Sequence, residues 1–234
     1  MKAYQDASLA PVRRAKALLE EMTLAEKIGQ LNQRLYGFRI YERKCVNGED
    51  TIELSEEFCQ EVEKYSGLGV LYGLYRADPW ADKNYETGLT GVLSKKAYNQ
   101  VQRYVLEHSR LGIPVMMSSE CPHGHQALDG YLLPVNLLAG ATFDPAMVRA
   151  AYRVSGRQLQ NMGVDLALMS MLDVLRDPRW GRSEECYSED PYLSARMAEA
   201  AVIGMQESGP EVVAKHFAAP VSYTHLRAHE TDQY

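Results

Sequence analysis

The sequence predicts an α/β protein of barrel type, built on a parallel sheet. Two observations carry this prediction. Short apolar segments typical of buried strands alternate with amphipathic helical segments, and polar clusters follow three of those strands. With 234 residues, 46% of them apolar, the chain can bury the core of one such domain.

The N-terminal 35 residues form a predicted helical lead-in. The segments "PVRRAKALLEEM" and "TLAEKIGQL" both have helical periodicity, and Thr23 with Glu26 three places later is a capping box for the second. Residues 36–60 are interpreted as a peripheral insertion. It contains a turn at Asn47-Gly48, which a short acidic helix follows.

Strands and helices then alternate. Asp144-Pro145 and Asp190-Pro191 are cap and first-turn signals for two of the helices, and Gly163 ends the first of these. This order implies right-handed crossovers and a parallel sheet, in which functional groups gather at the strand C-terminal ends. The strands are predicted in "GLGVLYGL", "IPVMMSS", "VDLALMSM" and "EVVAKHF", and the helices in "SKKAYNQVQRYVLEHSRLG", "DPAMVRAAYRVSGRQLQNMG" and "YLSARMAEAAVIGMQ".

Composition limits the classes of partner and the compartment. A net charge of -6 without a basic stripe argues against nucleic acid, and no segment approaches the roughly 20 apolar residues of a membrane span. The N-terminus has no apolar core of signal-peptide type, and the cysteines form no CxxC pair, so we expect reduced thiols in a cytoplasmic protein. The cysteines are Cys45, Cys59, Cys121 and Cys186. The oligomeric state is not predicted.

The three polar clusters define a candidate site. They are "SSECPHGHQ" at 118–126, "LRDPRWGRSEECYSED" at 175–190 and "AKHF" at 214–217. In a closed barrel, Glu120, Arg182, Lys215 and His216 would converge from these segments and offer an acceptor and several donors. Such a set suits a polyhydroxylated ligand. Alternatively, Glu120 and Arg182 pair across the barrel mouth, and the histidine is structural.

The segments "RDPRWGRSEECYSEDPYL" and "AKHF" together resemble the signature of glycoside hydrolase family 3. Three further segments agree with that family: "MTLAEKIGQL", "IPVMMSSECPHGH" and "GATFDPAMVRAAYRVSGRQLQNMGVDLAL". The resemblance runs from about residue 10 to residue 219. Only the insertion and the stretch "RADPWADKNYETGL" match loosely.

The resemblance implies a retaining β-glycosidase that removes terminal non-reducing sugars from β-glucosides or β-xylosides. It implies that the chain is the N-terminal part of a (β/α)8 TIM-type barrel, incomplete within this chain. In most members an α/β sandwich domain follows the barrel, and the resemblance implies no metal or organic cofactor. By the same resemblance, Arg182, Lys215 and His216 bind hydroxyls of the sugar at the cleavage site. Glu120 does likewise, although many relatives carry Asp at that position.

Retention requires two carboxyl groups about 5 Å apart. The family's nucleophilic Asp comes from a strand well beyond the Lys-His pair and its acid/base comes later, so the resemblance implies no catalytic residue in this chain. Glu184 and Glu185 are adjacent in sequence, and adjacent residues seldom direct both of their carboxyl groups at the same bond. They are interpreted as acceptors that order the loop.

The last residues, 220–234, are interpreted as a non-native tail, because "VSYTHLRAHE" is also the translation of a transposon-library sequencing adapter. His225 and His229 are therefore excluded as a metal pair. On this interpretation, residues 1–219 are a partial barrel domain with an unpaired parallel edge. We expect the polypeptide to be inactive and to aggregate or fold incompletely.

Two other classes stay open at this point. The "HGH" at 123–125, with Lys215 after a later strand, imitates a zinc-dependent amidohydrolase. The chain could also be a non-catalytic sugar-binding half-barrel. Within the resembled family, a β-xylosidase is the alternative to a β-glucosidase.

Overall fold

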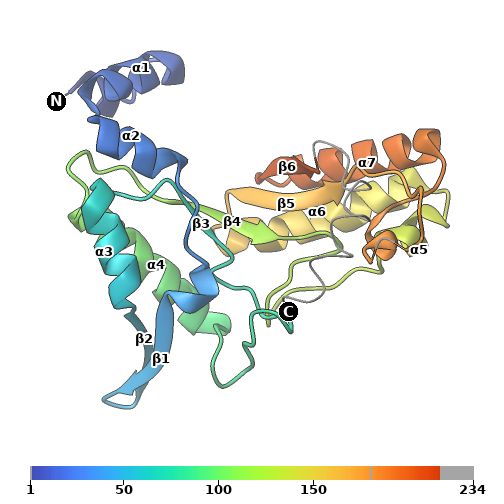
Figure 1. Ribbon diagram of the computed structural model, residues 1–234, viewed down its shortest axis with the longest axis horizontal. Helices are drawn as coiled ribbons and strands as arrows, with labels where there is room; N and C mark the ends of the chain where they lie inside the picture. The colour runs from blue at the N-terminus through green and yellow to red at the C-terminus, as the bar shows by residue number, and fades with distance from the viewer. Residues whose placement is uncertain (1, 180, 217–234) are drawn as a thin grey trace.

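The computed structural model describes residues 2–179 and 181–216 (Figure 1). At its centre is a four-stranded parallel sheet in the order β3-β4-β5-β6, so each strand pairs with the next one along the chain. This is the strand order of a (β/α)8 barrel wall, and the predicted α/β class is confirmed. The strands are β3 (Val70–Tyr72), β4 (Met116–Glu120), β5 (Leu166–Met171) and β6 (Glu211–Lys215).

The two crossover helices with Asp-Pro start signals begin where the sequence predicts, whereas the helix predicted from Ser94 begins at Gly91. The Asp144 side chain accepts a hydrogen bond from the Met147 amide at 3.0 Å, and the Asp190 side chain accepts one from the Tyr192 amide at 3.0 Å. Each aspartate satisfies an amide that has no partner within its helix. The helices are α4 (Gly91–Glu107), α5 (Asn136–Gly140), α6 (Pro145–Asn161) and α7 (Pro191–Gln206), of which α5 was not predicted.

Helices α6 and α7 pack side by side, and α7 contacts β5 and β6 (Figure 1). Their close approach depends on Gly204 of α7, since a Cβ atom placed there would lie 2.2 Å from the carbonyl oxygen of Arg149 in α6. Apolar residues of both helices are buried, namely Val148, Tyr152 and Leu159 of α6 and Met197 and Ala201 of α7.

The helical lead-in is confirmed as α1 (Pro11–Glu21) and α2 (Leu24–Leu31). The predicted capping box is present: the Thr23 amide donates to Glu26 Oε2 at 2.7 Å, and the Glu26 amide donates to Thr23 Oγ1 at 3.2 Å. Arg110, which follows α4, donates to both carboxylate oxygens of Glu26, at 2.9 Å and 2.7 Å. This ion pair holds the lead-in against the sheet domain.

The insertion is a β-hairpin of β1 (Tyr41–Val46) and β2 (Glu49–Leu54), followed by α3 (Glu56–Tyr65). The predicted turn and helix are confirmed, because Asn47 and Gly48 occupy the left-handed turn positions with φ of 53° and 82°. The two strands were missed because charged residues alternate with only a few buried ones. The hairpin projects from the sheet (Figure 1). Tyr41 and Ile52 anchor it, because both side chains belong to the main hydrophobic core.

Two compositional predictions can be compared with the structure. All four cysteines are free thiols, as predicted; Cys121 and Cys186 are buried and Cys45 is exposed. Within residues 2–179 and 181–216, no helix combines the length and apolar character needed to cross a bilayer. The tail at 220–234, with His225 and His229, lies outside the described residues.

Candidate functional site

The centre of the candidate site is an ion pair between the ends of β4 and β6. Lys215 Nζ donates a 2.7 Å hydrogen bond to Glu120 Oε2, and the two side chains are only 14% and 16% exposed. The other carboxylate oxygen of Glu120 accepts a 3.0 Å hydrogen bond from the hydroxyl of Tyr72, at the end of β3. Burial beside this carboxylate raises the pKa of Tyr72, which therefore stays protonated and acts as a donor.

A register shift in the sheet sets the position of Lys215. Leu168 pairs with Val213, but Lys215 pairs with Met171, so β5 contains one more residue than β6 over this span. Such an irregularity bends the strand and redirects the residues that follow it. The amide of Leu172 donates to the Lys215 carbonyl at 2.8 Å and fixes the strand end, and the next peptide bond, Lys215–His216, is cis.

Arg182 lies in the loop between β5 and α7. Its Nε and Nη2 donate to the two carboxylate oxygens of Glu185 at 2.5 Å and 2.7 Å, and its Nη1 lies 3.3 Å from His216 Nε2. Burial alone would raise the pKa of Glu185, but the hydrogen bonds and charge of Arg182 outweigh it, and the pKa lies below its ordinary value. The interpretation of Glu185 as a loop-ordering acceptor is confirmed.

Asp173 is a site residue that the sequence analysis missed. Its Oδ2 lies 3.1 Å from His216 Nδ1, and the residue is 8% exposed. The contact orients the imidazole with Nε2 toward Arg182. Asp173 is the first acidic residue after β5, and this position at a strand C-terminal end is the signal that could have found it.

The structure thus brings together all four predicted site residues. Glu120 and Lys215 form one pair, Arg182 and His216 form another contact, and the pKa of Arg182 is raised by Glu185 first and then by the more distant Glu120 and Asp173. The described ion pairs of Glu120 and Arg182 are with Lys215 and Glu185 respectively. Three carboxylates and three nitrogen-bearing side chains therefore meet at one edge of the sheet.

His123 and His125 lie in the loop that follows β4. His125 is fully buried, its Nε2 is 2.9 Å from Ser119 Oγ, and burial lowers its pKa to about 4. Gly124 allows this loop to pack, since a Cβ atom there would lie 2.1 Å from the Tyr131 carbonyl oxygen. In the described part of the chain, no three His, Cys, Asp or Glu side chains are placed to hold a metal ion.

Aromatic side chains border the site on the β3 side. Arg76 hydrogen-bonds to the Tyr72 hydroxyl, and its guanidinium lies 4.4 Å from the ring centroid of Trp80. Trp80 packs edge to face with Tyr36 at 5.0 Å, and both rings are about two-fifths exposed, at 44% and 41%. This cluster was not predicted, because Tyr36, Arg76 and Trp80 come from the two segments with weak patterns, although Tyr72 lies in a predicted strand.

Fold and site together define the protein class: a parallel α/β barrel-type domain with a dense polar site at the C-terminal ends of its strands. The model of the "Glycosyl hydrolase family 3 N terminal domain" matches residues 23–233. The chain belongs to this family, and the predicted resemblance is confirmed.

Individual relatives agree. A protein of Formosa agariphila named "Putative beta-xylosidase" is 31% identical over 225 residues, which are 93% of this chain and 28% of the relative. A β-glucosidase structure from Erythrobacter marinus superposes with a TM-score of 0.72 and 29% identity, over 93% of this chain and 27% of that one. The β-glucosidase of Listeria innocua in complex with glucose gives a TM-score of 0.67 and 28% identity, over 88% and 26%. This chain thus spans about a quarter of the length of each.

Proposed function

We propose that the chain is the sugar-binding part of a retaining β-glycosidase that removes terminal non-reducing β-D-glycosyl residues, with β-glucosides as the preferred substrates. The observation that carries the proposal is the convergence of Glu120, Lys215, Arg182 and His216 at the strand ends, supported by membership of glycosyl hydrolase family 3.

The proposed roles follow from donor and acceptor chemistry. Lys215 and Arg182 donate to sugar hydroxyl oxygens, and the Glu120 carboxylate accepts from a hydroxyl hydrogen. His216, held by Asp173 at 3.1 Å, presents Nε2 to the ligand side. Because these groups already hold one another in place, a sugar meets a largely preformed site and little side-chain freedom is lost on binding.

The carboxylates of the site are assigned to binding. A retaining mechanism requires one carboxylate to attack the anomeric carbon and a second carboxyl to protonate the leaving oxygen. Glu120 and Glu185 are each ion-paired with a cation, and Asp173 contacts His216. We therefore propose that the nucleophile and the acid/base belong to parts of the parent enzyme outside the described residues.

Calorimetric titration of the chain with glucose tests the binding site. We expect Lys215→Ala and Arg182→Ala each to weaken glucose binding by at least tenfold, since a hydrogen bond from a charged group contributes about 1.5–3 kcal/mol. Arg179→Ala is the matched control, because Arg179 lies in the same loop but is 80% exposed and forms its ion pair with Asp177. Equal affinities for all three variants and the parent chain would contradict the proposal.

Turnover is tested separately with nitrophenyl β-glucoside. We expect none from this chain, whereas binding of glucose is retained. Turnover that Arg182→Ala abolishes would show that the catalytic carboxyls lie within the chain and would overturn that part of the proposal.

A β-xylosidase is the second candidate, and the 31% identity to the Formosa agariphila protein favours it. Xylose lacks the hydroxymethyl group of glucose, so the two sugars differ in how they fill the site. Tighter binding of xylose than of glucose in the same titration would select this candidate. Binding of either sugar by a chain whose longer parent also lacks turnover would select a non-catalytic sugar-binding module.

A further inference from the structure

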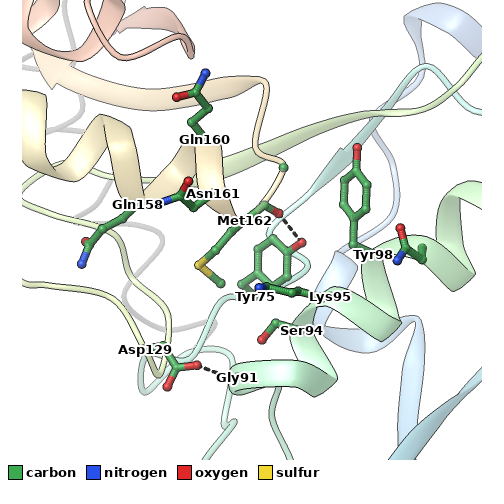
Figure 2. A pocket seen from close by; sticks show the side chains of 12 residues that line it. Tyr75, Gly91, Ser94, Lys95, Tyr98, Asp129, Gln158, Gln160, Asn161 and Met162 are labelled. Atoms are coloured by element: carbon green, nitrogen blue, oxygen red, sulfur yellow. Dashed lines mark hydrogen bonds between the residues drawn. The ribbon is translucent and has the colours of Figure 1, made fainter.

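A cavity of about 510 Å³ lies between the start of α4, the end of α6 and the loop that carries Asp129 (Figure 2). Its volume falls within the roughly 300–1,000 Å³ typical of small-molecule sites. None of its lining residues belongs to the site at the strand ends. The family's sugar site therefore leaves this cavity without a role.

The floor of the cavity contains a polar group without a partner. Ser94 of α4 lines the cavity and is 5% exposed, and its hydroxyl has no hydrogen-bond partner among the described residues. An unsatisfied buried hydroxyl is destabilising, and most buried polar groups in proteins have a partner. Its oxygen is almost completely shielded from solvent, so a ligand hydroxyl in the cavity would satisfy it after a small shift of the side chains that cover it.

The residues that line the cavity carry both neutral and charged hydrogen-bonding groups. Gln158 accepts a 3.1 Å hydrogen bond from the Tyr131 amide through Oε1, which leaves its NH2 group for a ligand. The side chain of Asn161 and the ring of Tyr98 also line the cavity (Figure 2). Two tyrosine rings and Met162 supply apolar surface against which the faces of a sugar ring can pack.

The charges select the class of ligand. Lys95 and Asp129 both line the cavity, and Asp129 Oδ2 accepts a 2.6 Å hydrogen bond from the Gly91 amide at the start of α4. The carboxylate therefore already occupies the position at this helix start that an anion would seek. The lining of one cation, one anion and several amides and hydroxyls favours a neutral ligand with several hydroxyl groups.

We propose that this cavity is a second binding site, independent of the one at the strand ends, for a neutral polyhydroxylated molecule of mono- or disaccharide size. Ser94 donates to or accepts from one ligand hydroxyl, Gln158 and Asn161 bind others, and Tyr98 contacts the ring. The site acts in binding only, and no chemical step takes place there.

The test is calorimetric titration with cellobiose, using a matched pair of variants. Ser94→Ala removes the hydroxyl in the cavity, and Ser155→Ala removes another buried hydroxyl without a described partner, in α6 but outside the cavity lining. We expect Ser94→Ala to weaken binding at this site threefold to tenfold and Ser155→Ala to leave it unchanged. Asn161→Ala, on the exposed rim, is a second variant that should weaken binding without a folding defect.

A Lys215→Ala background separates the two sites. Cellobiose binding that persists in this background and is weakened by Ser94→Ala supports the second site. Loss of all binding with Lys215→Ala alone, or equal effects of the two serine variants, overturns it while leaving the site at the strand ends intact. Conversely, if binding depends on Ser94 but not on Lys215, the cavity site stands and the proposed function fails.

Discussion

Lys215 and Glu120 are 95 residues apart in sequence, yet their side chains form a 2.7 Å ion pair across the end of the sheet. They lie on β6 and β4, and β5 separates the two strands. Because both side chains are largely shielded from water, each needs the other's charge. The same ion pair therefore stabilises the sheet and positions Glu120 and Lys215 in the candidate site.

Removing the cation tests this link. We expect Lys215→Met to lower the free energy of unfolding by about 1–3 kcal/mol, because it leaves the Glu120 carboxylate partly buried without its cation. Lys96→Met is the control, since the Lys96–Glu49 pair is 44% and 78% exposed and should change stability by no more than about 0.5 kcal/mol. Urea unfolding monitored by circular dichroism measures both, and indistinguishable midpoints for the two variants would contradict the prediction.

His125 gives the protein an acid-sensitive range. Burial lowers its pKa from the ordinary 6.5 to about 4, so the unfolded chain takes up a proton at a higher pH than the folded protein does. The stability that the neutral imidazole contributes is present above pH 6.5 and falls as the pH drops toward 4, by about 3 kcal/mol in all.

We expect His125→Gln to flatten the unfolding free energy between pH 6.5 and pH 4, whatever its effect at neutral pH. Urea titrations at half-unit pH intervals measure the slope. A slope that is the same in the parent and in His125→Gln would rule out this histidine as its source.

Glu26 acts in a lower and largely separate pH range. The hydrogen bonds from Arg110 are the largest cause that lowers its pKa, from 4.5 to about 2, against an opposing effect of burial. The pair therefore stabilises the fold above pH 4.5, and this stabilisation is lost as the pH falls toward 2. Glu26→Gln should reduce the loss of stability below pH 4.5, measured by thermal unfolding, while Glu20→Gln, on the exposed part of α1, should not.

Gly204 is expected to tolerate no side chain. Alanine has the better helix propensity by about 1 kcal/mol, yet its Cβ would approach the Arg149 carbonyl at 2.2 Å and force α6 and α7 apart. We expect Gly204→Ala to lower the melting temperature by several degrees. Glu199→Ala, on the exposed face of the same helix, should leave it within about two degrees. A higher melting temperature for Gly204→Ala would show that α7 does not need this close contact.

Local signals in the sequence were enough to predict the parallel strands and the described α-helices other than α5. Asp144, Asp190 and the Thr23–Glu26 pair could be identified as helix starts from sequence alone. The capping hydrogen bonds join residues no more than three positions apart, so they depend only on local sequence. The strands of the hairpin gave no such signal. Their polar faces hide the alternation, and only contacts with distant parts of the core bury Tyr41 and Ile52.

The site was predictable as a set of residues but not as a network. Glu120, Arg182, Lys215 and His216 stand in polar clusters after strands, and their segments match a family signature. Which carboxylate holds which cation depends on strand register and loop conformation, and these follow from tertiary packing. For this reason Asp173 and the Tyr72–Arg76–Trp80 border were found only in the structure.

The strand order has a kinetic consequence. Since β5 lies between β4 and β6, Glu120 of β4 and Lys215 of β6 can come together only after β5 has paired with both of these strands. Contacts this distant along the chain form slowly, because the entropy of closing a long loop is lost before the contacts contribute any stabilisation. The glucose binding proposed for this site should therefore appear later in refolding than the helical circular dichroism signal, and it would report completion of the sheet.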